Sequence, residues 1–192
     1  MPAIPKPTPA TYQDVLDAPE HLVAEVLAGT LYTHSRPAGP HAEAASVLGM
    51  DIGSAFHRGR GGPGGWIILD EPELHFELDI LVPDLAGWHR DRLPAVPKSA
   101  YFELAPNWVC EVLSPSTALM DRRNKLPIYA REQVPYVWLV DPRARSVEVF
   151  ELAGEHYRCL AVHGEDEVVR LPPFDAIELE LSALWPSVPS EE

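Results

Sequence analysis

An acidic residue inside a short apolar run is the feature that most constrains how this chain folds. The run extends from Trp108 to Leu113 and reads Trp-Val-Cys-Glu-Val-Leu, with a Ser-Pro-Ser turn after it. An apolar run of this length between turn signals predicts a buried β-strand. Glu111 is the acidic residue, and a buried carboxylate is unfavourable unless a positive or hydrogen-bonding group meets it. On a pleated strand it shares a face with Val109 and Leu113.

A second acidic residue lies upstream, in a segment with strand periodicity. Residues 74–82 alternate between an apolar face and a polar face that carries Asp79, which predicts one half-covered strand. Two carboxylates held together on neighbouring strands do not both ionise unless a cation joins them. Oxygen ligands of this kind suit Mg²⁺ or Mn²⁺. The alternative is that Asp79 faces solvent and Glu111 pairs with an arginine. Spacing alone favours the solvated position for Asp79 and a functional role for Glu111.

Length and composition predict one globular domain. The chain has 192 residues, of which 46% are hydrophobic. We expect a proline-rich lead over residues 1–10, a single domain over 11–186 and a tail over 187–192. Because no apolar run is long enough to span a bilayer and no signal-peptide core opens the chain, we expect a cytoplasmic protein without a membrane partner. Cys110 and Cys159 both lie in predicted strands, which favours buried thiols over a disulfide or a zinc site.

The charge is strongly negative overall but unevenly distributed. A formal net charge of −14 argues against nonspecific electrostatic binding of nucleic acid by the protein surface as a whole. Residues 86–131 nevertheless carry seven Lys/Arg against four acidic residues, so basic side chains concentrate around Glu111. This concentration suggests substrate contacts, although exposed helices often carry such charges without a binding role.

Periodicity and turn signals give the remaining elements. We expect helices over 19–25, 41–57 and 117–132, the last interrupted by Pro127, and strands over 30–34 and 66–69. Residues 83–105 read as a long connection, 136–140 and 146–152 as a central hairpin, and 157–162 with 168–171 as an edge hairpin. The glycine-rich segment 58–65 reads as a flexible loop and lacks the ending of a phosphate-binding loop. The order indicates an α/β or α+β fold with a mixed central β-sheet flanked by helices.

The motifs around the Glu111 strand resemble a known family. They are Pro106-Asn-Trp-Val-Cys-Glu-Val-Leu-Ser-Pro-Ser-Thr117, then Asp121, Lys125 and Tyr129-Ala130, then Val134-Pro-Tyr-Val-Trp-Leu-Val-Asp-Pro142. This combination resembles the Uma-type restriction endonuclease family of the PD-(D/E)XK nuclease superfamily, over residues 12–184. Residues 24–31 and His41 are similar to the family's N-terminal signature. The resemblance implies a restriction-endonuclease-like fold.

The resemblance also implies a metal site. When the family's motif is aligned with this sequence, the expected ligands of Mg²⁺ or Mn²⁺ are Asp79, Glu111 and the backbone carbonyl of Val112. Leu113 stands where the family's three-letter motif has its lysine, and Lys125 from the next helix is the expected replacement. Glu25 supplies a further carboxylate. Asp79 follows a leucine, where the family usually has a proline. The candidates for phosphate contacts are Arg90, Arg92, Arg122 and Arg123.

Three functions remain open at this point. The first is a metal-dependent endonuclease that hydrolyses DNA phosphodiester bonds, with Asp79 and Glu111 holding Mg²⁺ and Lys125 assisting. A homodimer is expected with it, since cutting both strands favours two sites. The second is a catalytically impaired binding or regulatory module of the same fold, which Leu113 and the −14 charge favour. The third is a hydrolase that uses the same carboxylates on another phosphate substrate.

Overall fold

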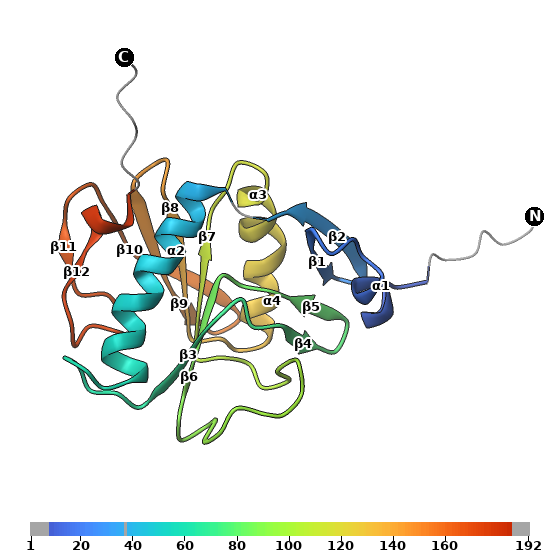
Figure 1. Cartoon of the computed structure of the whole chain (residues 1–192), viewed down its shortest axis with the longest axis horizontal. Coiled ribbons are helices and arrows are strands. Elements are labelled where there is room, and N and C mark those ends of the chain that lie inside the picture. The colour runs from blue at the N-terminus through green and yellow to red at the C-terminus, as the bar shows by residue number, and fades with distance from the viewer. Residues whose placement is uncertain (1–7, 37, 186–192) are drawn as a thin grey trace, which may run out of the picture.

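A six-stranded mixed sheet forms the centre of the structure, a computed structural model that describes residues 8–36 and 38–185 (Figure 1). Its strand order is β10-β9-β8-β7-β6-β3, and only β7 and β8 are parallel. The strands are β3 (Trp66–Asp70), β6 (Leu85–His89), β7 (Trp108–Val112), β8 (Tyr136–Asp141), β9 (Ser146–Ala153) and β10 (His156–Gly164). The expected mixed sheet is therefore confirmed. The expected tail, and residues 1–7 of the expected lead, lie outside the described residues.

A smaller antiparallel sheet, in the order β2-β1-β5-β4, lies beside the large one. Its strands are β1 (Leu22–Leu27), β2 (Thr30–Ser35), β4 (Leu74–Phe76) and β5 (Asp79–Leu81). The strand over 30–34 is confirmed, but the helix expected over 19–25 is wrong, because that segment contains β1. Ala28 and Gly29 both have positive φ, at 50° and 73°, so they form the tight turn that pairs β1 with β2.

The single strand expected over 74–82 is also wrong. The chain reverses at Glu77 and Leu78, so that Phe76 pairs with Asp79 across a two-residue turn. Glu77 adopts φ 38°, and the Leu78 side chain is exposed. Apolar and polar residues happen to alternate through this turn as they do in a strand. The alternation therefore predicted one continuous strand where the structure has a hairpin.

Two helical segments lie against the large sheet. They are α2 (Gly39–Ile52) with its π-helical continuation η1 (Gly53–His57), and the continuous segment α3 (Ala118–Met120), η2 (Asp121–Lys125) and α4 (Leu126–Arg131). The short helix α1 (Tyr12–Leu16) lies instead beside β1 of the small sheet. The expected helices over 41–57 and 117–132 are confirmed. Pro127 lies in the first turn of α4, directly after the π-helical η2, and does not end the segment. Among the helices of the described ranges, none is both long and apolar enough to cross a membrane.

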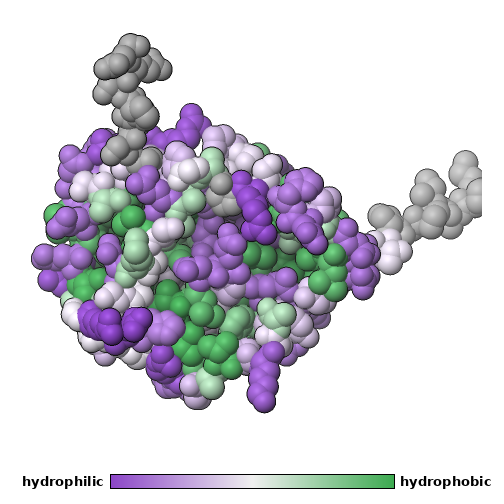
Figure 2. Space-filling model, in the orientation of Figure 1, coloured by the Kyte–Doolittle hydropathy of each residue, from purple (hydrophilic) through white to green (hydrophobic). Residues whose placement is uncertain are grey.

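The core lies on both faces of the large sheet. Trp108, Cys110 and Val112 pack on one face, in a cluster that includes buried side chains of α2. Val109 and Leu113 point to the opposite face and pack in a cluster that includes buried side chains of α4. The predicted alternation along β7 is confirmed, so Glu111 faces α4. On the face seen in Figure 2, hydrophobic side chains gather between α2 and the β4–β5 hairpin.

The last part of the chain differs from expectation in its pairing. The hairpin of β8 and β9 is confirmed, but β10 pairs with β9 rather than with residues 168–171. Those residues contribute β11 (Val168–Val169), which pairs with β12 (Leu179–Glu180), and the 3₁₀ turn η3 (Leu181–Leu184) follows. Cys110 is buried as expected, but Cys159 is exposed because β10 is an edge strand.

The segment expected as a long connection contains a central strand, β6. Its position depends on Gly87, which lies between aromatic side chains of β3 and β7. A Cβ at Gly87 would come within 2.9 Å of Ile68, 3.2 Å of Trp66 and 3.3 Å of Trp108. Glycine normally weakens a strand, so the sequence pattern hid β6, while the close approach of three large side chains requires glycine here.

We expect Gly87→Ala to lower the free energy of unfolding by about 1–3 kcal/mol, because the added methyl group overpacks this contact. Urea denaturation followed by tryptophan fluorescence measures the change. The matched control is Gly53→Ala, where a Cβ would meet nothing within 4 Å and the backbone is helical. An equal loss in both variants would contradict this account of β6.

Candidate active site

A buried carboxylate, a lysine and a tyrosine lie in contact between β7 and the helical segment that follows it. Glu111 on β7 is 3% exposed. Its Oε1 accepts a hydrogen bond from the Tyr129 hydroxyl at 2.5 Å, and the Lys125 ammonium lies 3.2 Å from Oε1 and 3.3 Å from Oε2. Each partner comes from the α3–α4 segment, which in Figure 1 lies between β7 and the β1–β2 hairpin. Glu111 therefore meets both a positive charge and a hydrogen-bond donor.

Lys125 gathers three carboxylates around one ammonium group. Its Nζ lies 2.9 Å from Glu25 Oε1, 3.2 Å from Glu111 Oε1 and 3.4 Å from Asp121 Oδ1. Glu25 comes from β1, and its Oε1 also accepts a hydrogen bond from the backbone N–H of Val82 at 2.8 Å. Asp121 lies one π-helical turn before Lys125. Residues almost a hundred positions apart are thus joined at one point.

A fourth carboxylate, Asp84, borders the same space. It precedes β6, and its Oδ2 accepts a hydrogen bond from the backbone N–H of Val112 at 2.7 Å. Its Oδ1 lies 3.2 Å from His41 Nε2, near the start of α2. Asp84 is thereby fixed to the residue next to Glu111. We call Glu25, Asp84, Glu111 and Asp121 the carboxylate cluster.

The carboxylate cluster borders a cavity of about 40 Å³, which is large enough for a small hydrated group. Asp84, Glu111, Asp121 and Lys125 line it together with Val112, His34, His41, Ser114 and Thr117. A wider cavity of about 340 Å³ adjoins it, since His41, Glu71 and Asp84 line both. The small cavity therefore opens toward a space that a larger ligand can enter.

Burial and crowding shift the ionisation of these groups. Burial raises the pKa of Glu111 well above its ordinary value, and Asp121 and Asp84 add to that rise while Lys125 opposes it. Burial also raises the pKa of Asp121. For Lys125, burial disfavours the ammonium, but Glu111, Glu25 and Asp121 outweigh it and raise the pKa well above its usual value. Lys125 stays protonated, and it is the one ammonium group among the acidic side chains of Glu25, Glu111 and Asp121.

Asp79, the first acid expected from the sequence, lies elsewhere. It begins β5, and its Oδ1 accepts a hydrogen bond from the backbone N–H of Ala28, while its Oδ2 pairs with Arg131 at 2.6 Å. It does not line the cavity beside Glu111. The turn at Glu77 and Leu78 turns its side chain toward the β1–β2 turn, so the expected pairing of Asp79 with Glu111 needs correction. Asp84, rather than Asp79, lines the cavity together with Glu111.

A sequence signal for Asp84 was present. Asp84 follows Pro83, so it has the preceding proline that is usual in the family that the sequence resembles and that Asp79 lacks. The other expected site residues are partly brought together. Lys125 contacts both Glu111 and Glu25, and Val112 lines the cavity. Leu113 is buried among apolar side chains. Tyr129, which was not among the expected site residues, contacts Glu111 directly.

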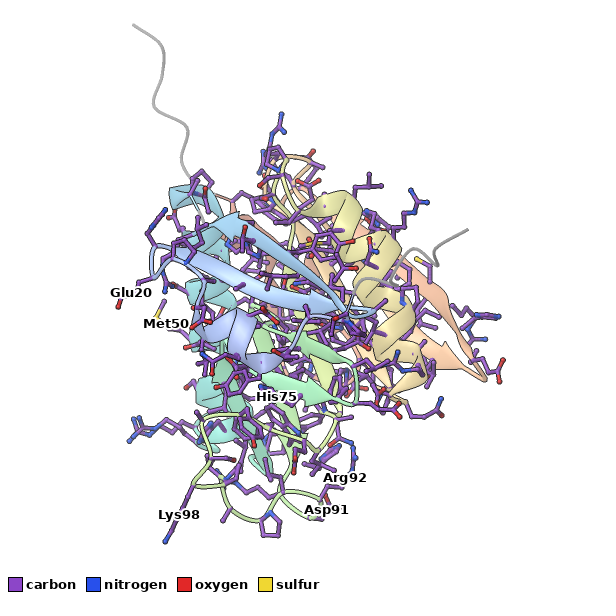
Figure 3. The ribbon with its side chains drawn as sticks, turned by 90° about the vertical axis from the view of Figure 1, so that its right-hand side faces the viewer. Glu20, Met50, His75, Asp91, Arg92 and Lys98 are labelled. Atoms are coloured by element: carbon purple, nitrogen blue, oxygen red, sulfur yellow. The ribbon has the colours of Figure 1, made fainter. Side chains whose placement is uncertain are left out.

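The four expected phosphate contacts divide into two pairs. Arg122 and Arg123 are exposed on η2, next to Asp121, and Arg122 forms a two-pronged ion pair with Glu148. Arg90 and Arg92 follow the far end of β6. Because β6 and β7 are antiparallel, this end lies beside Trp108, opposite the end where Asp84 and Glu111 meet. Figure 3 shows Arg92 projecting from the outer loop, so this pair is not brought to the cavity.

The oxygen atoms of the carboxylate cluster suit a divalent cation that retains some of its bound water molecules. Within residues 8–36 and 38–185, no group of three His, Cys, Asp or Glu side chains is placed to enclose a metal alone. Mg²⁺ does not require such a cage, since it is usually bound by one or two carboxylates, waters and substrate phosphate. Asp84 and Glu111 border one cavity. Burial is the main cause of the raised pKa of Glu111, and the nearby carboxylates of Asp121 and Asp84 add a repulsion that a cation would relieve.

Removing the Tyr129 hydroxyl tests the contact with Glu111. We expect Tyr129→Phe to lower the free energy of unfolding by about 1–3 kcal/mol, because a buried acceptor loses its donor. Urea denaturation measures the change. Tyr32→Phe is the control, since the Tyr32 side chain is exposed. A similar small change in both variants would contradict a structural role for the Tyr129–Glu111 hydrogen bond.

The mixed sheet, with acidic residues at the ends of two neighbouring strands and a lysine from the following helix, has a restriction-endonuclease-like fold. The chain belongs to the Uma2 family, described as "Putative restriction endonuclease", whose family model matches residues 9–183. Among solved structures it is similar to a "putative nuclease belonging to DUF820" from Anabaena variabilis ATCC 29413. That similarity has a TM-score of 0.75 and 23% identity, over 92% of this chain and 98% of the other. No curated protein matches.

Proposed function

We propose that this protein is a metal-dependent endonuclease that hydrolyses phosphodiester bonds in DNA. The observation that carries the proposal is the carboxylate cluster, in which acidic residues from separate elements converge on one buried lysine beside a cavity. Membership of the Uma2 family supports the same activity. Because hydrolysis of both DNA strands favours two such sites, the proposal includes a homodimer.

The proposed metal ligands are Asp84, Glu111 and the backbone carbonyl of Val112, with Asp84 in the role expected for Asp79. Mg²⁺ or Mn²⁺ bound there would polarise the scissile phosphate and lower the pKa of a bound water. Asp84 is held for this role by the Val112 N–H and by His41, on its two oxygens. Glu111 is oriented by Tyr129. Both carboxylates are therefore fixed before any ligand arrives.

Lys125 supplies positive charge rather than a base. Glu25 and Asp121 hold the ammonium in place and raise its pKa, so it donates hydrogen bonds at any physiological pH. In the proposed reaction it orients the attacking water or stabilises negative charge that develops on the phosphate. Glu25 is a positioning residue in this scheme, since it acts through Lys125. A lysine from the helix replaces the motif lysine because Leu113 packs in the core instead.

Cleavage of supercoiled plasmid DNA tests the proposal. We expect nicked and linear products with Mg²⁺ or Mn²⁺ and none with excess EDTA. Single-stranded DNA, RNA and nucleotides, tested in parallel, separate a DNA endonuclease from a hydrolase of other phosphate esters. Intact plasmid under every metal condition, with the protein folded, would contradict the proposal.

A binding or regulatory module of the same fold is the second candidate. The observation that favours it is that both Glu111 oxygens already have partners, in Lys125 and Tyr129. Isothermal titration calorimetry with Mn²⁺ distinguishes the two. If the protein is an endonuclease, it should bind Mn²⁺, and Glu111→Gln should abolish that binding. A binding or regulatory module that does not catalyse the reaction does not need to bind Mn²⁺.

A further inference from the structure

Four arginines form a second charged feature, at the opposite end of the sheet from the carboxylate cluster. They are Arg58, Arg60, Arg90 and Arg92, which we call the distal basic surface. All four are exposed. Residues 52–69 contain no acidic residue, and Asp91 is the only one among residues 86–102. In a protein with a net charge of −14, these two segments thus carry more positive than negative charge.

These arginines are not engaged by the protein's own carboxylates. Most other arginines pair with acidic residues, as Arg122, Arg131, Arg145, Arg158 and Arg170 do. Within the described part of the chain, the four arginines of the distal basic surface form no ion pair. Their guanidinium groups are available to an external anion.

Hydrogen bonds hold the two loops that carry them in a defined arrangement. The loop over 58–65, expected to be flexible, is bonded back to η1: Arg60 N–H donates to Ser54 O at 2.9 Å, and Gly64 N–H donates to Ala55 O at 3.0 Å. Gly62 lies so close to Ala55 that a Cβ would come within 2.6 Å of the Ala55 Cβ. Arg90 N–H donates to Gly65 O at 2.9 Å and joins the second loop to the first.

The two loops leave the same end of the β3–β6 pair. Trp66 pairs with His89, so Gly65 and Arg90 follow at the end of this ladder. In Figure 1 both loops lie at the lower end of the sheet, and Figure 2 shows strongly hydrophilic side chains over the loop between η1 and β3. Asp84 lies at the other end of β6. The five residues of β6 lie between Asp84 and Arg90, and the six steps along the strand correspond to about 20 Å.

We propose that the distal basic surface binds the phosphate backbone of duplex DNA, beside the cleavage site. This inference rests on the proposed function, since it takes the substrate to be DNA. Guanidinium groups bind phosphate in two-pronged geometry, and such contacts fix the register of a duplex without reading bases. Since phosphates on one strand lie 3.4 Å apart along the axis, about 20 Å corresponds to about six base pairs. The surface explains how so acidic a protein retains its substrate.

The distance of about 20 Å between Asp84 and Arg90 favours duplex DNA over another anionic partner. A nucleotide or a short single strand at the cavity would not reach Arg90, whereas a duplex extends in a straight line over this distance. The other large source of negative charge is the acidic surface of a second copy of this chain. That partner predicts a change in self-association rather than in DNA binding, so one experiment distinguishes them.

The test compares Arg58→Gln/Arg60→Gln/Arg92→Gln with a control of equal charge, Arg143→Gln/Arg158→Gln/Arg170→Gln. All six side chains are on the surface, and the control arginines that form ion pairs do so at exposed positions, where such pairs contribute little. Fluorescence anisotropy measures the affinity for a 24-base-pair duplex in EDTA, where no cleavage occurs. Sedimentation velocity measures self-association, and thermal melting checks the fold.

We expect the distal variant to bind at least about tenfold more weakly than the wild type, with a salt dependence lower by about three counterions. The control should change by less than about threefold. Equal effects of the two variants, a loss confined to RNA, or a change in self-association without a change in DNA affinity would overturn the inference. Absence of cleavage would contradict the proposed function but leave this binding result standing.

Discussion

Asp84→Asn is expected to reduce cleavage of supercoiled plasmid by about 10³-fold or more, since it removes one charged group that holds the metal and stabilises charge at the reacting phosphate. Asparagine keeps an oxygen that can accept from the Val112 N–H, so the local structure should persist. The rate of plasmid nicking at saturating Mg²⁺ measures the effect, with circular dichroism as the check on folding.

Asp79→Asn is the matched comparison, because it makes the same change at the buried acid that the family resemblance indicated as a metal ligand. Asp79 pairs with Arg131 and caps the Ala28 N–H, so its loss should lower stability while the nicking rate of the folded fraction stays within about threefold. The assay is run at 15 °C, where the variant remains folded. A nicking rate that collapses in Asp79→Asn and survives in Asp84→Asn would show that the cavity is not the catalytic site.

Lys125→Met is expected to produce the largest loss of stability, about 3–5 kcal/mol, because it leaves buried carboxylates without their cation. Glu25 and Glu111 are 0% and 3% exposed, so water cannot replace the ammonium. Urea denaturation at pH 7 measures the loss. Lys98→Met, at an exposed loop position, is the control and should change stability by less than about 0.5 kcal/mol.

The loss in Lys125→Met should depend on pH. Without the ammonium, the pKa values of Glu25, Glu111 and Asp121 all rise in the folded state, above those of the unfolded chain. The folded state then binds more protons, so stability falls as pH rises above the unfolded values. We therefore expect the variant to be closer to the wild type at pH 5 than at pH 8. A deficit that is constant across this range would indicate that lost packing, rather than unbalanced charge, is the cause.

Sequence pattern was sufficient for the elements that bury most of their apolar side chains. The run from Trp108 to Leu113, with five apolar residues between turns, is a buried strand as predicted, and Glu111 faces the helix that brings Lys125. The hairpin of β8 and β9 and the helix from 118 to 131 follow from the same rule. These parts of the site are set by local pattern and by the order of the elements.

Sequence periodicity failed where a turn or a close approach decided the structure. A two-residue turn at Glu77 has no glycine or proline to mark it, and it moved Asp79 away from the cavity. Gly87 concealed β6, whose first residue follows Asp84. Glu25 was expected on a short helix and lies on β1, yet it reaches Lys125, because pairing between β1 and β5 sets its position. Contacts over such sequence separations leave no periodic signal.

The central claim is that Asp84 and Glu111 together hold a divalent cation beside Lys125. A crystal structure of the protein soaked in Mn²⁺, with anomalous diffraction recorded for manganese, tests it most directly. The account predicts one anomalous peak in the small cavity, bounded by the carboxylates of Asp84 and Glu111, and its disappearance in Asp84→Asn. A peak at Asp79, or an empty cavity at Mn²⁺ concentrations that support cleavage, would contradict it.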